Sequence, residues 1–248
     1  MLIFLRKIRQ KLVKENKAKT YLLYAIGEII LVVIGIMIAV QINNWNAQKN
    51  TRNKELHYLE NIKIDLKNNI GTITSVITKR TKDVESAGQI IAHLEGLPIT
   101  DWKDFNERCI SIYAWDRFYQ INYTFEELTY SGNLALIKND SIKSMLLNLE
   151  SLYKQTKAEE DHFRFDTEEL IYKPLYSLVN LSPILRQSMG AEVEFSKDMF
   201  GNFFTDKRVK NGFWMVIVEF STMNGQLQKM KEVSENLIEI IDREMLKK

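Results

Sequence analysis

The sequence predicts an all-α protein, with one N-terminal transmembrane helix followed by an antiparallel bundle of long helices. Residues 21–42 form an almost unbroken apolar run, and apolar residues then recur at spacings near three and four over much of the chain. Only 3 Pro and 10 Gly interrupt the 248 residues. The single Cys109 excludes an intrachain disulfide framework and a multi-cysteine zinc site.

Residues 1–20 predict a basic amphipathic segment on the cytoplasmic side of a membrane. This segment holds seven Lys and Arg against one acid, Glu15, while the remaining chain holds 27 bases and 31 acids. Apolar residues are interleaved with the bases, as in helices that lie on anionic lipid. We therefore expect the lipid bilayer, and not nucleic acid, as the partner of this segment.

Residues 21–42 predict the transmembrane helix itself. At about 1.5 Å per residue the run is about 33 Å long, which is enough to cross a hydrocarbon core of about 30 Å. Tyr21 and Tyr24 at one end and Trp45 at the other are amphipathic rings suited to the two membrane interfaces. A secretory signal peptide is the alternative, but the run is longer than the usual apolar region and no A-x-A-like site follows it.

The charge bias across the run predicts the orientation. Lys and Arg are more frequent before the run than in the twenty residues after it, which places the N-terminus in the cytoplasm. Residues 43–248 are then expected outside the cytoplasm, as a periplasmic domain anchored in the inner membrane. A lone cysteine agrees with such a compartment.

Two stretches of the chain carry a resemblance. KTYLLYAIGEIILVVIGIMIAVQINNWN and TFEELTYSGNLALIKNDSIKSMLLNL (residues 124–149) are similar to the two recurrent blocks of an uncharacterised family of single-span membrane proteins from Bacteroidota. The resemblance implies a location and a shape. It brings no known activity, cofactor or catalytic residue.

One face of the apolar run predicts helix association. Glu28 is ionisable and expensive to place in lipid, and Gly35 and Ala39 form a pair of small residues that lets a second helix approach closely. The three residues share one helical face. Self-association or docking onto another membrane protein is one interpretation, and a Glu28 that reaches the interface beside an incidental Gly35 is the other.

Apolar spacing and end signals predict the helices of the outer domain. A long helix follows Trp45 and ends at Gly96–Pro98, and a second helix capped by Thr100 or Asp101 runs to about Tyr119. Thr124 and Glu127 fit a capping box for a short helix that Gly132 closes.

Asn139–Ser141 offer the N-cap of a third long helix, expected to run to about Tyr172 and to stop at Pro174. Residues 175–204 are expected to be looser. A last helix over about 205–245, with nearly heptad spacing, suggests coiled-coil packing. Residues 191–195 and 213–218 also fit short strands.

The sequence offers no pattern that predicts catalysis, a cofactor or a metal. Glu159 and His162 have the Glu-x-x-His spacing of di-iron bundles, but neither His57 nor His93 supplies the second such pair. An acidic, solvated helix face is the favoured interpretation, and it covers Glu159, Glu160, Asp161, Glu168 and Glu169. Cys109 is expected to be a buried small side chain.

Nine aromatic residues between Asp101 and Tyr130 predict a packed core or a recognition surface. Core packing is the favoured interpretation. In the alternative, Trp102 and Trp115 anchor a protein, peptide or glycan partner.

These expectations favour a non-enzymatic, membrane-anchored helical scaffold or accessory subunit of an envelope complex, acting as a homo-oligomer or with a membrane-protein partner. The alternative is a ligand-sensing bundle that signals through its transmembrane helix to a membrane partner.

Overall fold

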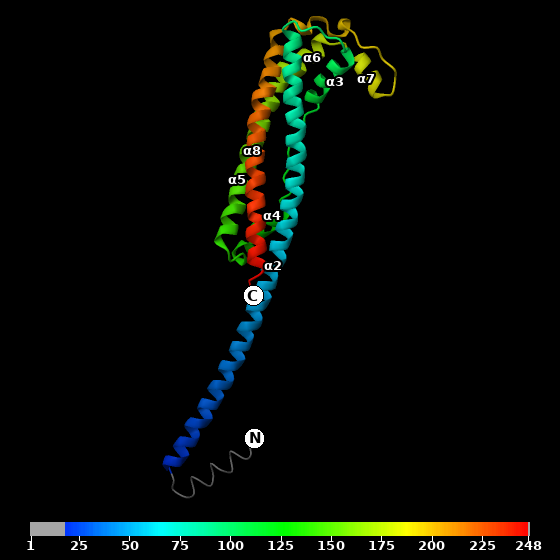
Figure 1. The fold of residues 1–248 in the computed structure, drawn as a ribbon. Coiled ribbons are helices and arrows are strands. Elements are labelled where there is room, and N and C mark those ends of the chain that lie inside the picture. The colour runs from blue at the N-terminus through cyan, green and yellow to red at the C-terminus, as the bar shows by residue number, and fades with distance from the viewer. Residues whose placement is uncertain (1–17, 248) are drawn as a thin grey trace. The chain divides into compact units, whose positions relative to one another are not determined.

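The computed structural model describes residues 18–247, and every regular element within them is helical (Figure 1). This confirms the all-α fold class. Residues 213–218 lie inside a helix and residues 191–195 have no regular structure, so the interpretation of these stretches as strands is wrong. The chain divides into two compact units, Met1–Leu56 and His57–Lys248, and the longest helix, α2 (Ala18–Leu94), contributes residues to both.

Three long helices build the second unit: residues 57–94 of α2, α5 (Asp140–Thr167) and α8 (Lys207–Met245) (Figure 1). Their directions follow from contacts between residues distant in sequence. Lys63 pairs with Asp242 and Glu95 with Lys210, each at 2.6 Å, so α2 and α8 are antiparallel. Asn139 donates to Glu244 at 2.8 Å while His162 faces Glu219, so α5 and α8 are also antiparallel. Helices α2 and α5 therefore run parallel.

Two parallel helices need a connection that returns along the bundle, and residues 95–139 provide it. It contains α3 (Trp102–Tyr113), an extended stretch over residues 115–122, α4 (Tyr123–Tyr130) and a short 3₁₀ turn, η1 (Asn133–Leu136). Side chains of α2 satisfy the backbone of the extended stretch and its flanks. Lys79 donates to the carbonyl of Ala114 and Arg80 to that of Asp116, each at 2.9 Å.

Asn69 of α2 makes the most complete of these contacts. Its amide nitrogen donates to the Ile121 carbonyl at 2.7 Å, and its amide oxygen accepts from the Ile121 N–H at 2.8 Å. Backbone groups with such partners do not need a helix. The predicted continuation of the second helix to about Tyr119 is therefore wrong, and α3 ends at Tyr113.

The predicted capping box of α4 is also wrong. Helix α4 begins after Asn122, so Thr124 lies inside the first turn, where it is buried. Asp65 of α2 accepts a hydrogen bond from the Thr124 N–H at 3.2 Å and replaces a local cap. Glu127 accepts from the Tyr58 hydroxyl at 2.9 Å. The predicted glycine stop is confirmed, because Gly132 follows the helix with a left-handed φ of 71°.

Pro174 does not end the third long helix. After α5 the chain continues through one π-helical turn, η2 (Glu168–Tyr172), into α6 (Lys173–Leu178), where Pro174 occupies the first turn. Proline is tolerated in a first turn because its nitrogen would have no helical partner there. The wider π turn thus lets the helix pass a residue that the sequence predicts as its stop.

Gly212 of α8 packs directly against this π turn. A Cβ at Gly212 would lie 2.7 Å from Cγ1 of Ile171 and 2.9 Å from the carbonyl oxygen of Leu170. Real Cβ atoms do not make such contacts, so α8 can approach η2 this closely only through glycine.

Residues 175–204, which the sequence predicts to be looser, are partly helical. It contains α7 (Ser182–Ser188) and η3 (Lys197–Phe204), a 3₁₀ segment bent at Gly201. Asp206 caps α8 by accepting from the N–H of Arg208 at 2.8 Å. The predicted last helix is confirmed to within two residues at its start.

The bundle has two separate hydrophobic clusters. The aromatic core is formed around α3, η2, α6, η3 and the first half of α8, and it includes Phe105, Cys109, Phe163, Phe200, Phe203, Phe213 and Phe220. The aliphatic core lies between the other halves of the long helices, and it includes Leu59, Ile62, Leu66, Ile73, Leu146, Leu149, Leu227 and Ile241.

Candidate functional site

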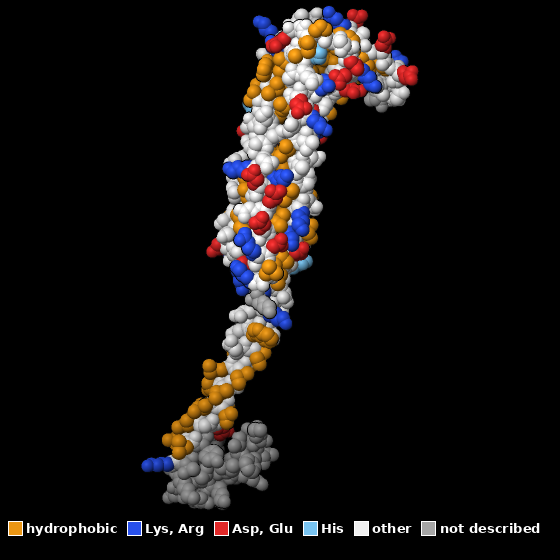
Figure 2. All heavy atoms as spheres, viewed as in Figure 1, with side chains coloured by type: hydrophobic (Ala, Val, Ile, Leu, Met, Phe, Trp, Pro, Cys, Tyr) orange, Lys and Arg blue, Asp and Glu red, His pale blue; other side chains and the backbone are white. Residues whose placement is uncertain are grey.

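The first unit presents a long apolar surface. Helix α2 contains an 18-residue stretch that is apolar enough to cross a membrane, and none of that stretch is buried. Figure 2 shows hydrophobic side chains gathered along this part of the chain. Among the described residues this is the one helix with the length and composition of a membrane span. Soluble proteins rarely leave so large a continuous apolar surface in water.

The three residues of the predicted association face lie within this surface. Glu28 is partly exposed, whereas Gly35 and Ala39 are exposed. No heavy atom lies within 4 Å of a Cβ built on Gly35. The face therefore has room for a second helix at Gly35, and association through it stays a prediction.

The predicted interface anchors are only partly described. Trp45 is exposed, and the ammonium of Lys49 lies 5.9 Å from its ring centroid. Tyr21 and Tyr24 lie within α2, but their side chains are outside the described part of the structure. Residues 1–17 of the predicted basic segment are also outside it.

Trp102 and Trp115 both pack against the aromatic core. The ring centroid of Trp102 lies 5.6 Å from that of Phe200 and 6.0 Å from that of Phe105. The ring centroid of Trp115 lies 4.9 Å from that of Phe163. Each tryptophan is only partly buried, and a binding role for them stays a prediction. The most exposed aromatic residues of the same region are the tyrosines Tyr119, Tyr123 and Tyr130.

A buried ion pair separates the two cores. Arg80 of α2 is 1% exposed and Glu160 of α5 is 0% exposed, and their side chains are 2.6 Å apart. The guanidinium of Arg80 also lies over the ring of Phe220, and burial lowers its pKa from the ordinary value. Glu160 accepts a second hydrogen bond, from the N–H of Phe118 at 2.9 Å.

This ion pair is incompletely hydrogen-bonded. Nε and Nη1 of Arg80 and Oε2 of Glu160 are buried without a partner in the described part of the chain. The expectation of a solvated acidic face is therefore wrong for Glu160. Periodicity places Glu160 on the same side of α5 as Thr156 and Phe163, which are both buried.

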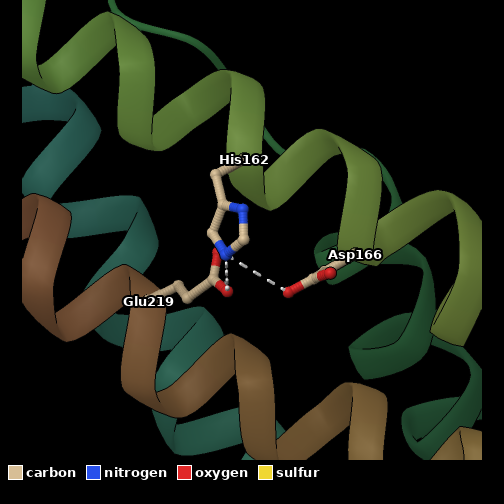
Figure 3. A group of neighbouring side chains, drawn as sticks. All are labelled: His162, Asp166 and Glu219. Carbon is tan, nitrogen blue, oxygen red and sulfur yellow. Dashed lines mark ion pairs between the residues drawn. The ribbon is translucent and has the colours of Figure 1, made fainter.

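A second polar group lies at the interface of α5 and α8. His162 and Asp166 stand one turn apart on α5, and Glu219 points toward them from α8 (Figure 3). Nε2 of His162 lies 3.7 Å from Oδ2 of Asp166 and 3.9 Å from Oε1 of Glu219. One potential ligand atom from each residue lies within 4.8 Å of the other two.

Glu219 is the unusual member of this group. The residue is 8% exposed, and neither carboxylate oxygen has a hydrogen-bond partner among the described residues. Burial and the neighbouring Asp166 carboxylate raise its pKa from 4.5 to about 7. His162, in contrast, is 61% exposed at its side chain, so the group is open to solvent on one side.

The comparison with known families concerns residues 28–158. These residues match the model of a family of unknown function, DUF6090. The chain belongs to this family. The matched DUF6090 region takes in part of the first block that carried the resemblance and all of the second, which confirms an uncharacterised family. No curated protein and no solved structure matches the chain.

The match to DUF6090 ends at residue 158, so it leaves out most residues of the buried ion pair and of the polar group around Glu219. It contains Arg80, but Glu160, His162, Asp166 and Glu219 all follow residue 158. The sequence pairs His162 with Glu159 by spacing, whereas in the structure the neighbours of His162 are Asp166 and Glu219. A usable signal was present in α8: Glu219 stands between Val216 and Phe220, on the apolar stripe of the helix.

Cys109 lies in the aromatic core, as predicted. It is 1% exposed, and burial raises the pKa of its thiol far above the ordinary value. A thiol that stays protonated is a poor nucleophile and a poor metal ligand.

Proposed function

We propose that this DUF6090 protein is a single-pass membrane protein whose helical bundle serves, outside the cytoplasm, as a non-enzymatic scaffold or accessory subunit. The observation that carries the proposal is the fully exposed apolar stretch of α2. A bilayer is the solvent that removes the free-energy cost of such a surface in water. The excess of Lys and Arg over residues 1–20 supports an N-terminus in the cytoplasm.

Association through the apolar helix completes the proposal. Gly35 and Ala39 lie four residues apart, and Glu28 lies seven residues before Gly35, so all three share one face. Gly35 leaves open space on that face. Small residues of this spacing let two helix backbones approach closely in lipid. A second copy of this chain or a helix of another membrane protein fits this surface.

Membrane integration and orientation are tested together with engineered cysteines. The native Cys109 is buried, so single cysteines at exposed Lys19 and Ser131 report without background. In spheroplasts of a Gram-negative host, a membrane-impermeant maleimide should label Ser131→Cys at once and Lys19→Cys only after the membrane is permeabilised. The reverse pattern would overturn the orientation, and release of the chain by alkaline carbonate would overturn membrane integration.

The association face is tested by measuring the mass of the protein complex in mild detergent. The double variant Glu28→Leu with Gly35→Leu should reduce the mass of the complex, because it removes the polar group and fills the open space. Met37→Leu is the control, since Met37 is also exposed but lies two residues from Gly35, on the opposite side of the helix. An unchanged mass of the double variant would exclude this face as the interface.

A ligand-sensing bundle is a second candidate function. It is favoured by the group of His162, Asp166 and Glu219, which leaves a buried carboxylate without a hydrogen-bond partner at the boundary of two bundle helices. A sensor should change its complex size in detergent when the ligand of the bundle is added. A scaffold should keep the same size with and without the ligand.

A further inference from the structure

The group at the interface of α5 and α8 has the residue types and the arrangement of a metal site. His162 and Asp166 are four residues apart on α5, a spacing that places two ligands on one face of a helix. Glu219 reaches the same point from α8, and Figure 3 shows the three side chains converging. Two helices that are distant in sequence thus contribute to one small polar site.

The distances suit a single ion. Four-coordinate sites with bonds of about 2.0–2.2 Å place neighbouring ligand atoms about 3.3–3.6 Å apart. Here Nε2 of His162 lies 3.7 Å from the Asp166 oxygen and 3.9 Å from the Glu219 oxygen, and all three atoms lie within 4.8 Å. Small side-chain rotations are enough to close these separations onto an ion.

The second, independent observation is the state of Glu219. Its carboxylate is nine-tenths buried and aimed into the group, and neither oxygen has a hydrogen-bond partner in the described part of the chain. No Lys or Arg of that part forms an ion pair with Glu219 or Asp166, and the nearby Arg80 is held by Glu160. A buried carboxylate without a hydrogen bond is costly, and a bound cation would compensate its charge directly.

We propose that His162, Asp166 and Glu219 bind one divalent transition-metal ion of the Zn²⁺ class. The imidazole nitrogen favours such an ion over Mg²⁺ or Ca²⁺, which prefer all-oxygen sites and more ligands. Three protein ligands leave a fourth position, and the exposed side of His162 opens that position to water or to a donor atom of a partner. This site is independent of the proposed membrane anchoring.

The ion would join the two antiparallel helices beside the aromatic core. Two of its ligands are directly followed by buried aromatic residues, since Phe163 follows His162 and Phe220 follows Glu219. Because only the folded bundle brings the three ligands together, the ion stabilises the fold by mass action. Metal supply would then regulate the stability of the bundle.

The test uses the full-length chain in detergent, carried on a tag without histidines and freed of metal with a chelator. Zn²⁺ added against a chromophoric chelator should bind at one ion per chain, and Co²⁺ should give the visible absorption of a four-coordinate site. Mg²⁺ and Ca²⁺ should compete poorly.

Three single variants identify the ligands: His162→Ala, Asp166→Asn and Glu219→Gln. Loss of a residue that only hydrogen-bonds to a metal ligand weakens metal binding about 10- to 100-fold, so loss of a ligand itself should weaken Zn²⁺ binding by at least about tenfold. Two variants are the matched controls. His57→Ala changes another exposed histidine, and Glu239→Gln changes an exposed glutamate of α8, the helix that carries Glu219. Circular dichroism of each metal-free variant separates loss of the site from loss of the fold.

The outcomes are distinct. One ion per chain, weakened by the three variants and not by the controls, supports the site. Absence of Zn²⁺ binding, or binding that the three variants leave unchanged, overturns it. Equal affinity for Ca²⁺ overturns the assignment to the Zn²⁺ class.

Discussion

The two cores of the bundle differ in how they are built. The aliphatic core is made by the apolar stripes of three long helices, and Phe118 is its single aromatic among the fully buried residues described. The aromatic core gathers seven buried phenylalanines around short elements and the π turn. Ring contacts link these elements in a chain, such as Phe105 with Phe200 at 5.2 Å and Phe163 with Phe220 at 4.8 Å.

This difference predicts how well each core tolerates substitution. Leu and Ile stripes repack easily when total volume is kept. Stacked and edge-to-face rings have specific geometries, and the aromatic core also depends on Gly212, on the buried pair of Arg80 and Glu160, and on the polar group around Glu219. We therefore expect the aromatic core to be the less tolerant of the two.

Removing one member of the buried ion pair should have the largest effect, because the pair forms the boundary between the cores. Glu160→Ala leaves the Arg80 guanidinium buried without its carboxylate and the Phe118 N–H without its acceptor. We expect the free energy of unfolding to fall by about 3–5 kcal/mol. Urea unfolding in detergent, followed by circular dichroism, measures it.

The double variant Arg80→Met with Glu160→Met is the control for this prediction. It removes both charges and should be more stable than Glu160→Ala, because an apolar pair carries no desolvation cost. A double variant as unstable as the single one would show that the charge left behind is not the cause.

Gly212→Ala should disturb the aromatic core alone. The new methyl group would overlap Ile171 and the Leu170 carbonyl, and overpacking of this kind costs about 1–3 kcal/mol. Gly225→Ala is the matched control in the same helix, where no heavy atom lies within 4 Å of the new Cβ. The control should gain about 0.5–1 kcal/mol from better helix propensity. Equal unfolding midpoints for the two variants would contradict the close contact.

Glu219 should give the aromatic core a pH dependence. Because the folded pKa of about 7 lies above the ordinary 4.5, the folded chain holds this proton more tightly than the unfolded chain does. The resulting stabilisation is complete below about pH 4.5 and is lost as pH rises through about 7. Each pKa unit corresponds to about 1.4 kcal/mol, so we expect a loss of about 3 kcal/mol.

The measurement is the unfolding free energy of the native chain minus that of Glu219→Gln, from pH 4 to 8 with a chelator present. That difference should decrease with pH, whereas the same difference taken with Glu239→Gln should stay flat. A difference that rises with pH would reverse the sign and refute the raised pKa.

The smallest expected loss of stability concerns the contact of Asn69 with Ile121, beside the aliphatic core. Asn69→Ala removes both hydrogen bonds to Ile121 and should cost about 1–2 kcal/mol. Hydrogen exchange should become faster over residues 115–122 while the long helices stay protected. Asn68→Ala, at an exposed neighbour, should leave the exchange unchanged. Slow exchange in the Asn69 variant would show that other contacts hold this stretch.

Local signals explain which parts of the fold were predictable from sequence. The end of α2 before Gly96, the Asn139 cap of α5 and the start of α8 depend on residues next to each other, and they were predicted to within a few residues. The end of α3 depends on side chains of α2 far away in sequence. The passage of the helix through Pro174 depends on the π turn packed against Gly212.

The candidate site was predictable only in part for the same reason. The composition of residues 21–42 is a local property, and the exposed apolar stretch was found from it. The group of His162, Asp166 and Glu219 needs the register of α5 against α8, which no local pattern contains. Glu160 is expected on a solvated face because a charged residue is usually exposed, yet its ion pair with Arg80 allows its burial.

The parallel arrangement of α2 and α5 also determines the order in which the bundle forms during synthesis. Both helices are made before α8, and each lies antiparallel to it, so the apolar stripes of both need a partner that is synthesised after them. The final turn of α8 reaches back to the start of α5 through Glu244 and Asn139. A nascent chain therefore keeps part of its bundle stripes uncovered until α8 has been made, and apolar surface exposed in this way is prone to aggregation.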